Sequence, residues 1–486
     1  MNSNELLKQL QEHFPYSSFR ADQAVILERV WTQSNTLALM PTGTGKSLCY
    51  QYPAKLQKKL VVVLSPLIAL MQDQKAKAVE LGISATEIHS NIGAEEREKR
   101  QRKLKEGHFN LLFVTPERFS KTEFRECLQN REIFLLAVDE AHCVSLWGHD
   151  FRPDYAKIPE IRKFLRMPPV LALTATATPD VQKDIVNKLG LEGDCEIISS
   201  GLERPNLILN VHEIYGLSEK LEKFYELYQQ FKNAGGSGSV ILYTVLIQTV
   251  QQISRFLSGK KIAHEVYHGD LLAHQRRRSL NQFMSQADNV MVATPAFGLG
   301  IDKKNIRQIF HFEIPSSLEE YFQQAGRAGR DGLPSECHFL FDEEDLHIQM
   351  EFIKWSHPEK SYIQQIYQLI RKNKDRWQQE GNDFLREQIS FKNKKDFRVE
   401  SAIHILERWG CLEKAEESGG SWILHHEPTD EMFRMEDSQL LTRSQNLKLL
   451  EMLKYAKEKE QCRLQKIYLY FGHHGEPCGQ CDICRS

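Results

Sequence analysis

Short apolar segments alternate with amphipathic segments from about residue 36 to residue 341. Apolar runs of strand length occupy residues 36–40, 60–65, 109–115, 133–140 and 170–176, and then residues 239–244, 262–269, 289–295, 306–315 and 337–341. Strands that are buried on both faces read as continuous apolar runs, and strand–helix alternation is typical of a parallel sheet. The pattern therefore predicts an α/β fold with two tandem parallel-sheet domains, each covered by helices on both faces.

The pattern changes near residue 344 and becomes mostly helical. Residues 361–373 and 440–471 have helical periodicity, and residues 399–426 between them read as a helix followed by a β-hairpin. The hairpin turn is expected at Ser418–Gly420. The helix and hairpin have the shape of a small winged-helix-like insert, and a purely structural helical insertion is the alternative. We predict two α/β domains and a C-terminal region, at residues 1–200, 201–343 and 344–486.

Composition narrows the class of protein. The chain has 486 residues, of which 41% are hydrophobic and 26% are charged. This excludes a wholly disordered chain, a collagen and a small disulfide scaffold. No apolar run reaches the roughly 18 residues that a membrane span needs, and the N-terminal segment does not resemble a signal peptide. We therefore expect a cytosolic protein. The formal net charge of −2 gives by itself no reason to expect a nucleic-acid partner.

A glycine-rich segment at residues 40–47 follows a predicted strand and precedes a helical pattern. Such a loop cradles phosphates with its backbone N–H groups and the N-terminus of the helix. In this interpretation Lys46 reaches the β- and γ-phosphates and Ser47 holds Mg²⁺. The other loop residues would bind the same phosphates; they are Thr42, Gly43, Thr44 and Gly45. Met40 stands where the consensus has its first glycine, and a simple glycine-rich turn is the alternative.

An acidic pair ends the predicted strand at 133–140. Asp139 is placed to contact Mg²⁺ on a bound nucleotide, and Glu140 to orient and deprotonate the attacking water. A solvated acidic strand end is the alternative. Further along, Arg327 and Arg330 lie three residues apart. Phosphoryl transfer needs a cation on the developing charge, so we assign Arg330 as the arginine finger with Arg327 beside it. A basic surface turn is the alternative.

Four of the ten cysteines crowd the last 25 residues: Cys462, Cys478, Cys481 and Cys484. Four thiolates suit a tetrahedral structural Zn²⁺ and leave no open coordination position for catalysis. An iron–sulfur cluster is the alternative, because thiolates also hold clusters. His473 and His474 lie nearby and could substitute as ligands. We expect the scattered cysteines, such as Cys143, to be packing residues.

Taken in order, these motifs resemble those of RecQ-family superfamily 2 helicases, in a short form similar to bacterial RecS-type proteins. Further matching segments lie at residues 16–23, 65–74, 115–118, 173–178, 201–206, 267–271 and 292–302. The resemblance implies two RecA-like domains with ATP between them and a RecQ-type zinc region. It also implies that Tyr16, Arg20 and Gln23 hold the adenine, and that Gln323 acts with the arginine pair.

Residues 143–155, directly after the acidic pair, resemble the family's aromatic-rich loop. Its key positions are occupied by Trp147, His149, Phe151 and Arg152. Aromatic faces stack on single-stranded bases at roughly 1–3 kcal/mol per base, and arginine adds phosphate or cation–π contacts. Because the loop adjoins Glu140, we expect it to report strand occupancy to the ATP site. The alternative is that Trp147 and Phe151 are core residues.

The resemblance implies an ATP-dependent DNA helicase that moves 3′ to 5′ on single-stranded DNA and unwinds duplex, forked or junction DNA in recombination and repair. It implies ATP, Mg²⁺ and Zn²⁺ as cofactors, and a single-stranded-DNA-binding protein or other repair proteins as partners at the bacterial nucleoid. Longer relatives carry a winged-helix and an HRDC domain after the zinc module; we expect this chain to lack both. A superfamily 2 RNA helicase and a DNA-stimulated regulatory ATPase or scaffold are the alternatives.

Overall fold

The computed structural model describes residues 2–20, 22–41, 43–145, 147–148, 151–199, 201–298, 301–389, 397–414, 422–435 and 438–486. The predicted hairpin turn and two predicted site residues, Thr42 and His149, lie outside these ranges. The chain forms two compact units. The first consists of Met1–Glu313, Leu318–Phe341 and Tyr455–Ser486, and the second of Ile314–Ser317 and Asp342–Lys454.

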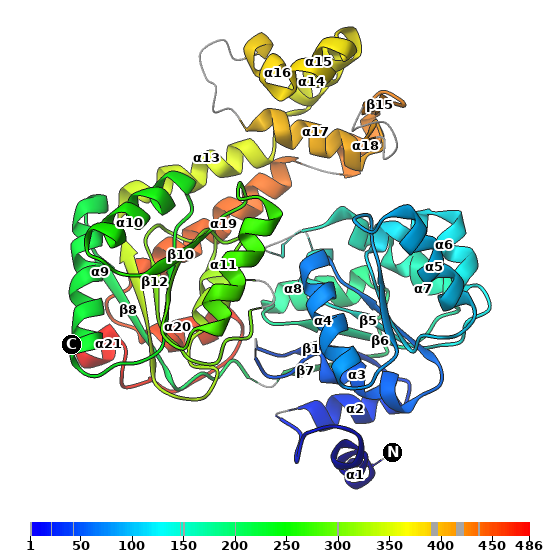
Figure 1. The fold of residues 1–486 in the computed structure, drawn as a ribbon, viewed down its shortest axis with the longest axis horizontal. Helices are drawn as coiled ribbons and strands as arrows, with labels where there is room; N and C mark the ends of the chain where they lie inside the picture. The colour runs from blue at the N-terminus through cyan, green and yellow to red at the C-terminus, as the bar shows by residue number, and fades with distance from the viewer. Residues whose placement is uncertain are drawn as a thin grey trace. The chain divides into compact units, whose positions relative to one another are not determined.

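The first unit opens with a sheet of seven parallel strands, in the order β3-β4-β2-β5-β6-β1-β7 (Figure 1). They are β1 (Asn35–Leu39), β2 (Leu60–Leu64), β3 (Ala85–Ile88), β4 (Leu111–Val114), β5 (Ile133–Val138), β6 (Val170–Thr174) and β7 (Cys195–Ser199). Its helices are α1 (Ser3–His13), α2 (Gln23–Trp31), α3 (Leu48–Leu56), α4 (Ile68–Glu80), α5 (Ala94–Lys105), α6 (Thr122–Leu128), α7 (Ile158–Phe164) and α8 (Pro179–Lys188), with short 3₁₀ turns η1 (Pro116–Ser120), η2 (Ala141–Val144) and η3 (Pro153–Lys157).

Both faces of this sheet are buried. Val62 and Leu64 belong to one apolar cluster, whereas their neighbours Val61 and Val63 belong to another. Successive side chains of a strand point to opposite faces, so the two clusters are the two layers between the sheet and its helices. This double burial explains why β2 reads as an uninterrupted apolar run in the sequence.

A second parallel sheet of six strands follows, in the order β10-β11-β9-β12-β13-β8. Its strands are β8 (Leu207–Glu213), β9 (Ser239–Tyr243), β10 (His264–Tyr267), β11 (Val290–Ala293), β12 (Ile306–His311) and β13 (Ser335–Phe341). Its helices are α9 (Gly216–Asn233), α10 (Ile247–Gly259), α11 (Ala273–Ser285) and α12 (Leu318–Ala325). The predicted α/β class with two parallel sheets is confirmed.

The sequence did not predict β3, β7 and β8, and all three are edge strands of their sheets. An edge strand lies against a neighbour on only one side, and these three carry polar residues within them. The terminal helices α20 (Arg463–Tyr470) and α21 (Asp482–Arg485) return to the second sheet beside β8 and complete the first unit (Figure 1).

The second unit is helical apart from one hairpin. It contains η4 (Glu343–Asp345), α13 (Leu346–Ser356), α14 (Lys360–Lys372), α15 (Lys374–Glu380), α16 (Asn382–Ile389), α17 (Arg398–Arg408), β14 (Leu412–Lys414), β15 (Trp422–Leu424), α18 (Asp430–Met435) and most of α19 (Ser438–Ala456). The expected helix and hairpin are thus present, with β14 and β15 antiparallel; a winged-helix identity remains a prediction. Within the described ranges, no helix combines the length and apolarity needed to cross a bilayer.

Candidate active site and metal centre

A cleft of about 1000 Å³ in the first unit is lined by residues from two domains, the one built on the seven-stranded sheet and the one built on the six-stranded sheet. Most of the predicted nucleotide-site residues line it: Tyr16, Arg20, Gln23, Gly43, Gly45, Lys46, Ser47, Asp139, Glu140, Gln323, Arg327 and Arg330. Thr44 is not among the described lining residues; its hydroxyl donates to the carbonyl of Pro41 at 2.7 Å. The structure therefore brings predicted residues from four separate motifs to one place.

The phosphate loop connects β1 to α3 and is held by Gln23. The Gln23 amide nitrogen donates to the carbonyls of Thr44 (3.0 Å) and Gly45 (2.9 Å), and its oxygen accepts from the backbone N–H of Arg20 at 2.8 Å. Gly45 has φ +86°, and a Cβ atom there would lie 2.6 Å from this amide nitrogen. Glycine is therefore required at this position both by the left-handed backbone and by the close approach of Gln23.

Several buried polar atoms around the cleft lack a hydrogen-bond partner among the described residues. They are Lys46 Nζ, Glu140 Oε2, Arg327 Nε and Arg330 Nε. Among the residues that the structure describes, the ammonium of Lys46 forms one ion pair, with the Glu140 carboxylate 3.8 Å away. Buried polar groups in folded proteins are nearly always satisfied, so three unsatisfied cationic donors indicate a site that receives an anion. The donor set fits the triphosphate of a nucleotide.

The acidic pair follows β5. Burial and, to a smaller extent, the charge of Glu140 raise the pKa of Asp139 from 3.8 to about 7, although Lys46 opposes the shift. The backbone N–H of Glu140 donates to Asp139 Oδ1 at 3.1 Å. A buried carboxylate with this pKa gains from a divalent cation, so Asp139 together with Ser47 fits the Mg²⁺ that accompanies a nucleotide.

Glu140 adopts the left-handed backbone conformation, with φ +49°. Non-glycine residues pay for this conformation, and such strain gathers at functional sites. Its Oε2 lies 3.4 Å from Nδ1 of His142, and that nitrogen is 2.9 Å from the hydroxyl of Thr174. Thr174 ends β6. The backbone turn and the His142 contact together fix where the Glu140 carboxylate points.

The arginine pair reaches the cleft from the second domain. Arg327 donates to the carbonyl of Gly298 and is buried. Arg330 donates to the carbonyl of Ile301 at 2.6 Å and pairs with Asp302 at 3.1 Å. A Cβ atom on Gly43 would lie 3.4 Å from Cδ of Arg330, so this arginine packs directly against the phosphate loop. Burial lowers the pKa of Arg330, yet a guanidinium remains charged in proteins.

The aromatic-rich loop is joined to the acidic pair. Trp147 is 41% exposed, so its indole is not a core side chain. A Cβ atom on Gly148 would lie 2.1 Å from the carbonyl oxygen of His142, which leaves no room for another residue. Arg152 donates to the carbonyl of Pro66 at 3.0 Å, and Phe151 is partly buried. These described loop residues do not line the cleft.

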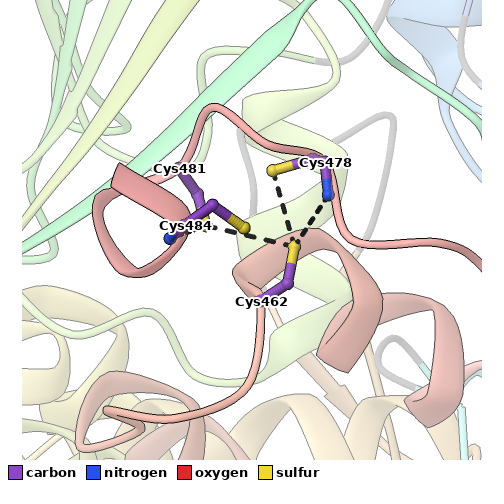
Figure 2. Close-up of side chains that lie close together, drawn as sticks. All are labelled: Cys462, Cys478, Cys481 and Cys484. Carbon is purple, nitrogen blue, oxygen red and sulfur yellow. Dashed lines mark hydrogen bonds between the residues drawn. The ribbon is translucent and has the colours of Figure 1, made fainter. Parts of the chain in front are cut away.

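The sulfur atoms of Cys462, Cys478, Cys481 and Cys484 converge on one point (Figure 2). All four lie within 4.8 Å of one another, with the Cys462 Sγ 3.4 Å from that of Cys478 and 4.0 Å from that of Cys481. A tetrahedral ion with Zn–S bonds of 2.3 Å separates its sulfurs by about 3.8 Å. A cluster would divide the four sulfurs among two or four iron atoms and would therefore place some of them further apart, so the donor set fits one zinc ion.

Thiolate character is favoured at one of the four sulfurs, whereas burial raises the pKa of Cys478 to about 12 and also raises that of Cys484. Burial opposes ionisation of Cys462, but backbone N–H groups, including that of Cys478 at 3.2 Å, lower its pKa to about 7. Beside the ligands, Arg463 forms a two-pronged ion pair with Asp482, with N–O distances of 3.0 and 2.8 Å. His473 instead contacts the Ser199 hydroxyl, at 3.3 Å.

Sequence reasoning missed several residues that line the cleft. Asp73 and Gln74 of α4 line it, and the buried Tyr50 hydroxyl donates to Gln74 Oε1 at 3.4 Å. Asp302 lines it as the partner of Arg330. These four residues lie in or beside segments that match the family's motifs, and this was the one indication in the sequence that they belong to the site. Their position in a motif does not, however, specify which residues they contact.

Three family models match the chain. Residues 20–185 match the DEAD/DEAH box helicase model, residues 219–332 the helicase conserved C-terminal domain, and residues 429–485 the RecQ zinc-binding model. Among solved structures, the Mycobacterium smegmatis helicase Lhr bound to ssDNA and AMP-PNP aligns with a TM-score of 0.55 and 19% identity, over 72% of this chain and 49% of that one. This likeness shows the fold, that of two RecA-like domains.

Two curated relatives come from Bacillus subtilis. ATP-dependent DNA helicase RecQ is 40% identical over 362 residues, which is 74% of this chain and 60% of that protein. The probable ATP-dependent DNA helicase RecS is 34% identical over 384 residues, 78% of this chain and 76% of that protein. The match thus spans about 60% of the length of RecQ and about three quarters of that of RecS. The two relatives and the zinc-binding model agree: the chain belongs to the RecQ family of helicases.

Proposed function

We propose that this protein is an ATP-dependent DNA helicase that translocates 3′ to 5′ on single-stranded DNA. The observation that carries the proposal is the cleft, where buried nitrogen atoms of Lys46, Arg327 and Arg330 that lack a hydrogen-bond partner among the described residues lie with one acidic pair. Such a site is suited to phosphoryl transfer, which depends on positioning and on charge stabilisation. The DNA helicase names of the relatives support DNA as the polymer. The 3′ to 5′ direction is taken from the resemblance to the RecQ family alone.

In this proposal the first domain binds the nucleotide. Tyr16, Arg20 and Gln23 hold the adenine, and the phosphate loop with Lys46 binds the triphosphate. Since Gln23 now bonds to the loop carbonyls, nucleotide binding must release its amide. Ser47 and Asp139 would hold Mg²⁺, which neutralises charge on the phosphates.

Hydrolysis then depends on residues from both domains. Glu140 orients and deprotonates the attacking water. Arg330 and Arg327 stabilise the charge that develops on the transferred phosphate, with Gln323 beside them at the cleft. Because the arginines come from the second domain and Lys46 from the first, hydrolysis and product release change what holds the two domains together.

The aromatic-rich loop couples this cycle to DNA. Trp147, with His149, Phe151 and Arg152, would stack on bases and contact phosphates. Gly148 touches the backbone of His142, and the His142 side chain contacts Glu140. The binding of a DNA strand to the loop can therefore be transmitted to the acidic pair through His142.

We propose that the protein acts on forked and junction DNA in recombination and repair at the bacterial nucleoid, with repair proteins as partners.

The test is strand displacement on matched substrates: a 3′-tailed DNA duplex, a 5′-tailed duplex, a fork, a four-way junction and the RNA equivalent. We expect ATP-dependent unwinding of the 3′-tailed DNA and the fork, and no activity in Lys46→Ala. Clear preference for RNA would support an RNA helicase instead. DNA-stimulated hydrolysis without displacement of any substrate would support a regulatory ATPase.

A further inference from the structure

The arginine loop, residues 326–333, carries both arginines of the cleft and follows α12. Three of its backbone carbonyls accept hydrogen bonds from one side chain of a distant segment. Arg204 Nη1 donates to the carbonyl of Gly326 at 2.9 Å, and Nη2 donates to those of Ala328 at 2.5 Å and Gly329 at 3.4 Å. The bound carbonyls lie on both sides of Arg327, so the guanidinium fixes the backbone from which this arginine projects.

Asn206 holds the same loop two residues further along the segment. Its Nδ2 donates to the carbonyls of Gly329 at 2.8 Å and Leu333 at 3.0 Å. Gly329 has φ +56°, and a Cβ atom there would lie 2.3 Å from Asn206 Nδ2. At Gly329 the arginine loop therefore lies too close to Asn206 for a side chain to fit between them. We expect the position of the loop to depend on both Arg204 and Asn206.

Arg204 acts at a distance from the cleft. It is absent from the described residues that line the cleft, whereas Arg327 and Arg330 are among them. Together with Pro41, Thr176 and Gln323 it instead borders a small neighbouring cavity. Its own backbone N–H donates to the hydroxyl of Tyr468, 3.2 Å away on α20 of the zinc region. Arg204 is thus held by Tyr468 through its backbone and binds the arginine loop through its side chain.

We propose that Arg204 is the positioning residue for the arginine pair, so that it raises the rate of hydrolysis without contacting nucleotide. The planar guanidinium presents several donors in a rigid fork, which one side chain uses here for three carbonyls. Removing it leaves those carbonyls unbound and frees the loop to move. This inference rests on the proposed ATPase function of the cleft.

The experiment measures DNA-stimulated ATP hydrolysis and binding of a fluorescent methylanthraniloyl-ATP in Arg204→Ala and Arg204→Lys. A misplacement near 1 Å costs roughly 100-fold in rate, so we expect kcat to fall about 10- to 100-fold in Arg204→Ala. The KM for ATP and the affinity for the fluorescent nucleotide should change less than about threefold, because ground-state binding is retained. Arg204→Lys keeps the charge but loses the fork, and should fall in between.

Arg162 provides a matched control. It is a buried arginine that, like the half-buried Arg204, binds backbone carbonyls, those of Pro168 at 3.0 Å and Gly190 at 3.5 Å, but within the first domain. Arg162→Ala should lower the melting temperature and leave kcat of the folded fraction unchanged. A comparable fall of kcat in this control would show that the Arg204 effect is general destabilisation and would overturn the proposal.

A double-mutant cycle gives the decisive readout. In an Arg327→Ala/Arg330→Ala background, Arg204→Ala should cost less than about twofold more, because both of the arginines it positions are gone. The same fold-loss in both backgrounds would refute the inference, as would unchanged kcat in Arg204→Ala. If Arg204→Ala does not fold, the cycle is run with Arg204→Lys. Failure of the proposed function would give a different result: the wild-type protein would hydrolyse ATP no faster than Lys46→Ala does.

Discussion

The buried carboxylate of Asp139 makes the protein less stable as the pH rises, and Asp139→Asn should remove that dependence. Burial raises the pKa of this group from 3.8 to about 7 in the folded protein. Between these values the folded state holds a proton that the unfolded chain has lost. Stability falls with pH wherever the folded state binds more protons, so the penalty grows from about pH 4 and is complete above about pH 7.

The size of the effect follows from the same shift. One pKa unit corresponds to 1.36 kcal/mol, so a rise from 3.8 to about 7 amounts to about 4 kcal/mol at most. From pH 5 to pH 8 only the last two units are crossed, which leaves about 2 to 3 kcal/mol. Asp139 is only 7% exposed, so solvent screens little of this cost. The asparagine variant should gain that much stability relative to wild type between the two pH values.

The assay is urea unfolding of nucleotide-free protein at pH 5 and pH 8, for wild type, Asp139→Asn and the exposed control Asp180→Asn. Only the difference between variant and wild type is compared, because groups that do not interact with Asp139 titrate equally in both. Asp180→Asn should stay within about 0.5 kcal/mol of wild type at both pH values. If Asp139→Asn differs from wild type by the same amount at pH 5 and pH 8, the carboxylate is not held protonated and the burial argument is wrong.

Three further outcomes are expected. Glu140→Gln should retain binding of fluorescent nucleotide but lose hydrolysis by roughly 10²- to 10⁴-fold, since an amide cannot accept the proton of water; retained turnover would remove Glu140 from the mechanism. Trp147→Ala should reduce DNA stimulation of the ATPase while basal hydrolysis persists, and equal stimulation in both proteins would contradict the coupling role. Cys478→Ser should lose zinc by metal analysis and lower the thermal stability of the purified protein, because structural zinc contributes folding energy directly; a full zinc content would argue against this ligand.

The central strands could be predicted from the sequence because their burial is symmetrical. Leu60–Leu64 alternates between two apolar layers, so each of its residues is apolar. In contrast, Cys195–Ser199 is an edge strand in which Glu196 pairs with Arg29 at 2.9 Å on the surface. This strand is stabilised by its pairing with β1, and no local pattern in its own sequence predicts that pairing. The missed strands are thus those whose stability comes from one partner and not from their own apolar faces.

The site divides in the same way. Lys46, Asp139 and the four cysteines could be named from the sequence because their chemistry requires that residue type at that spacing. Arg204 could not be assigned a role, because its partners lie 122 to 125 residues away and are backbone carbonyls. Every residue has a backbone carbonyl whatever its side chain, so nothing in the sequence distinguishes the carbonyls that bind Arg204 from any others.

Arg204 also explains why the zinc region belongs to the first compact unit although residues 342–454 separate it from the second sheet. Tyr468 accepts from the backbone of Arg204 across 264 residues, and Arg485 donates to Asn210 Oδ1 at 2.8 Å across 275 residues. The four thiolates fix α20 and α21 to each other, and these contacts fix both helices to the start of the second domain. Arg204 then contacts the zinc region through Tyr468 and the arginine loop through its guanidinium. Loss of zinc should therefore lower kcat as well as stability, and the fall should be smaller in Arg204→Ala, where that connection is already broken.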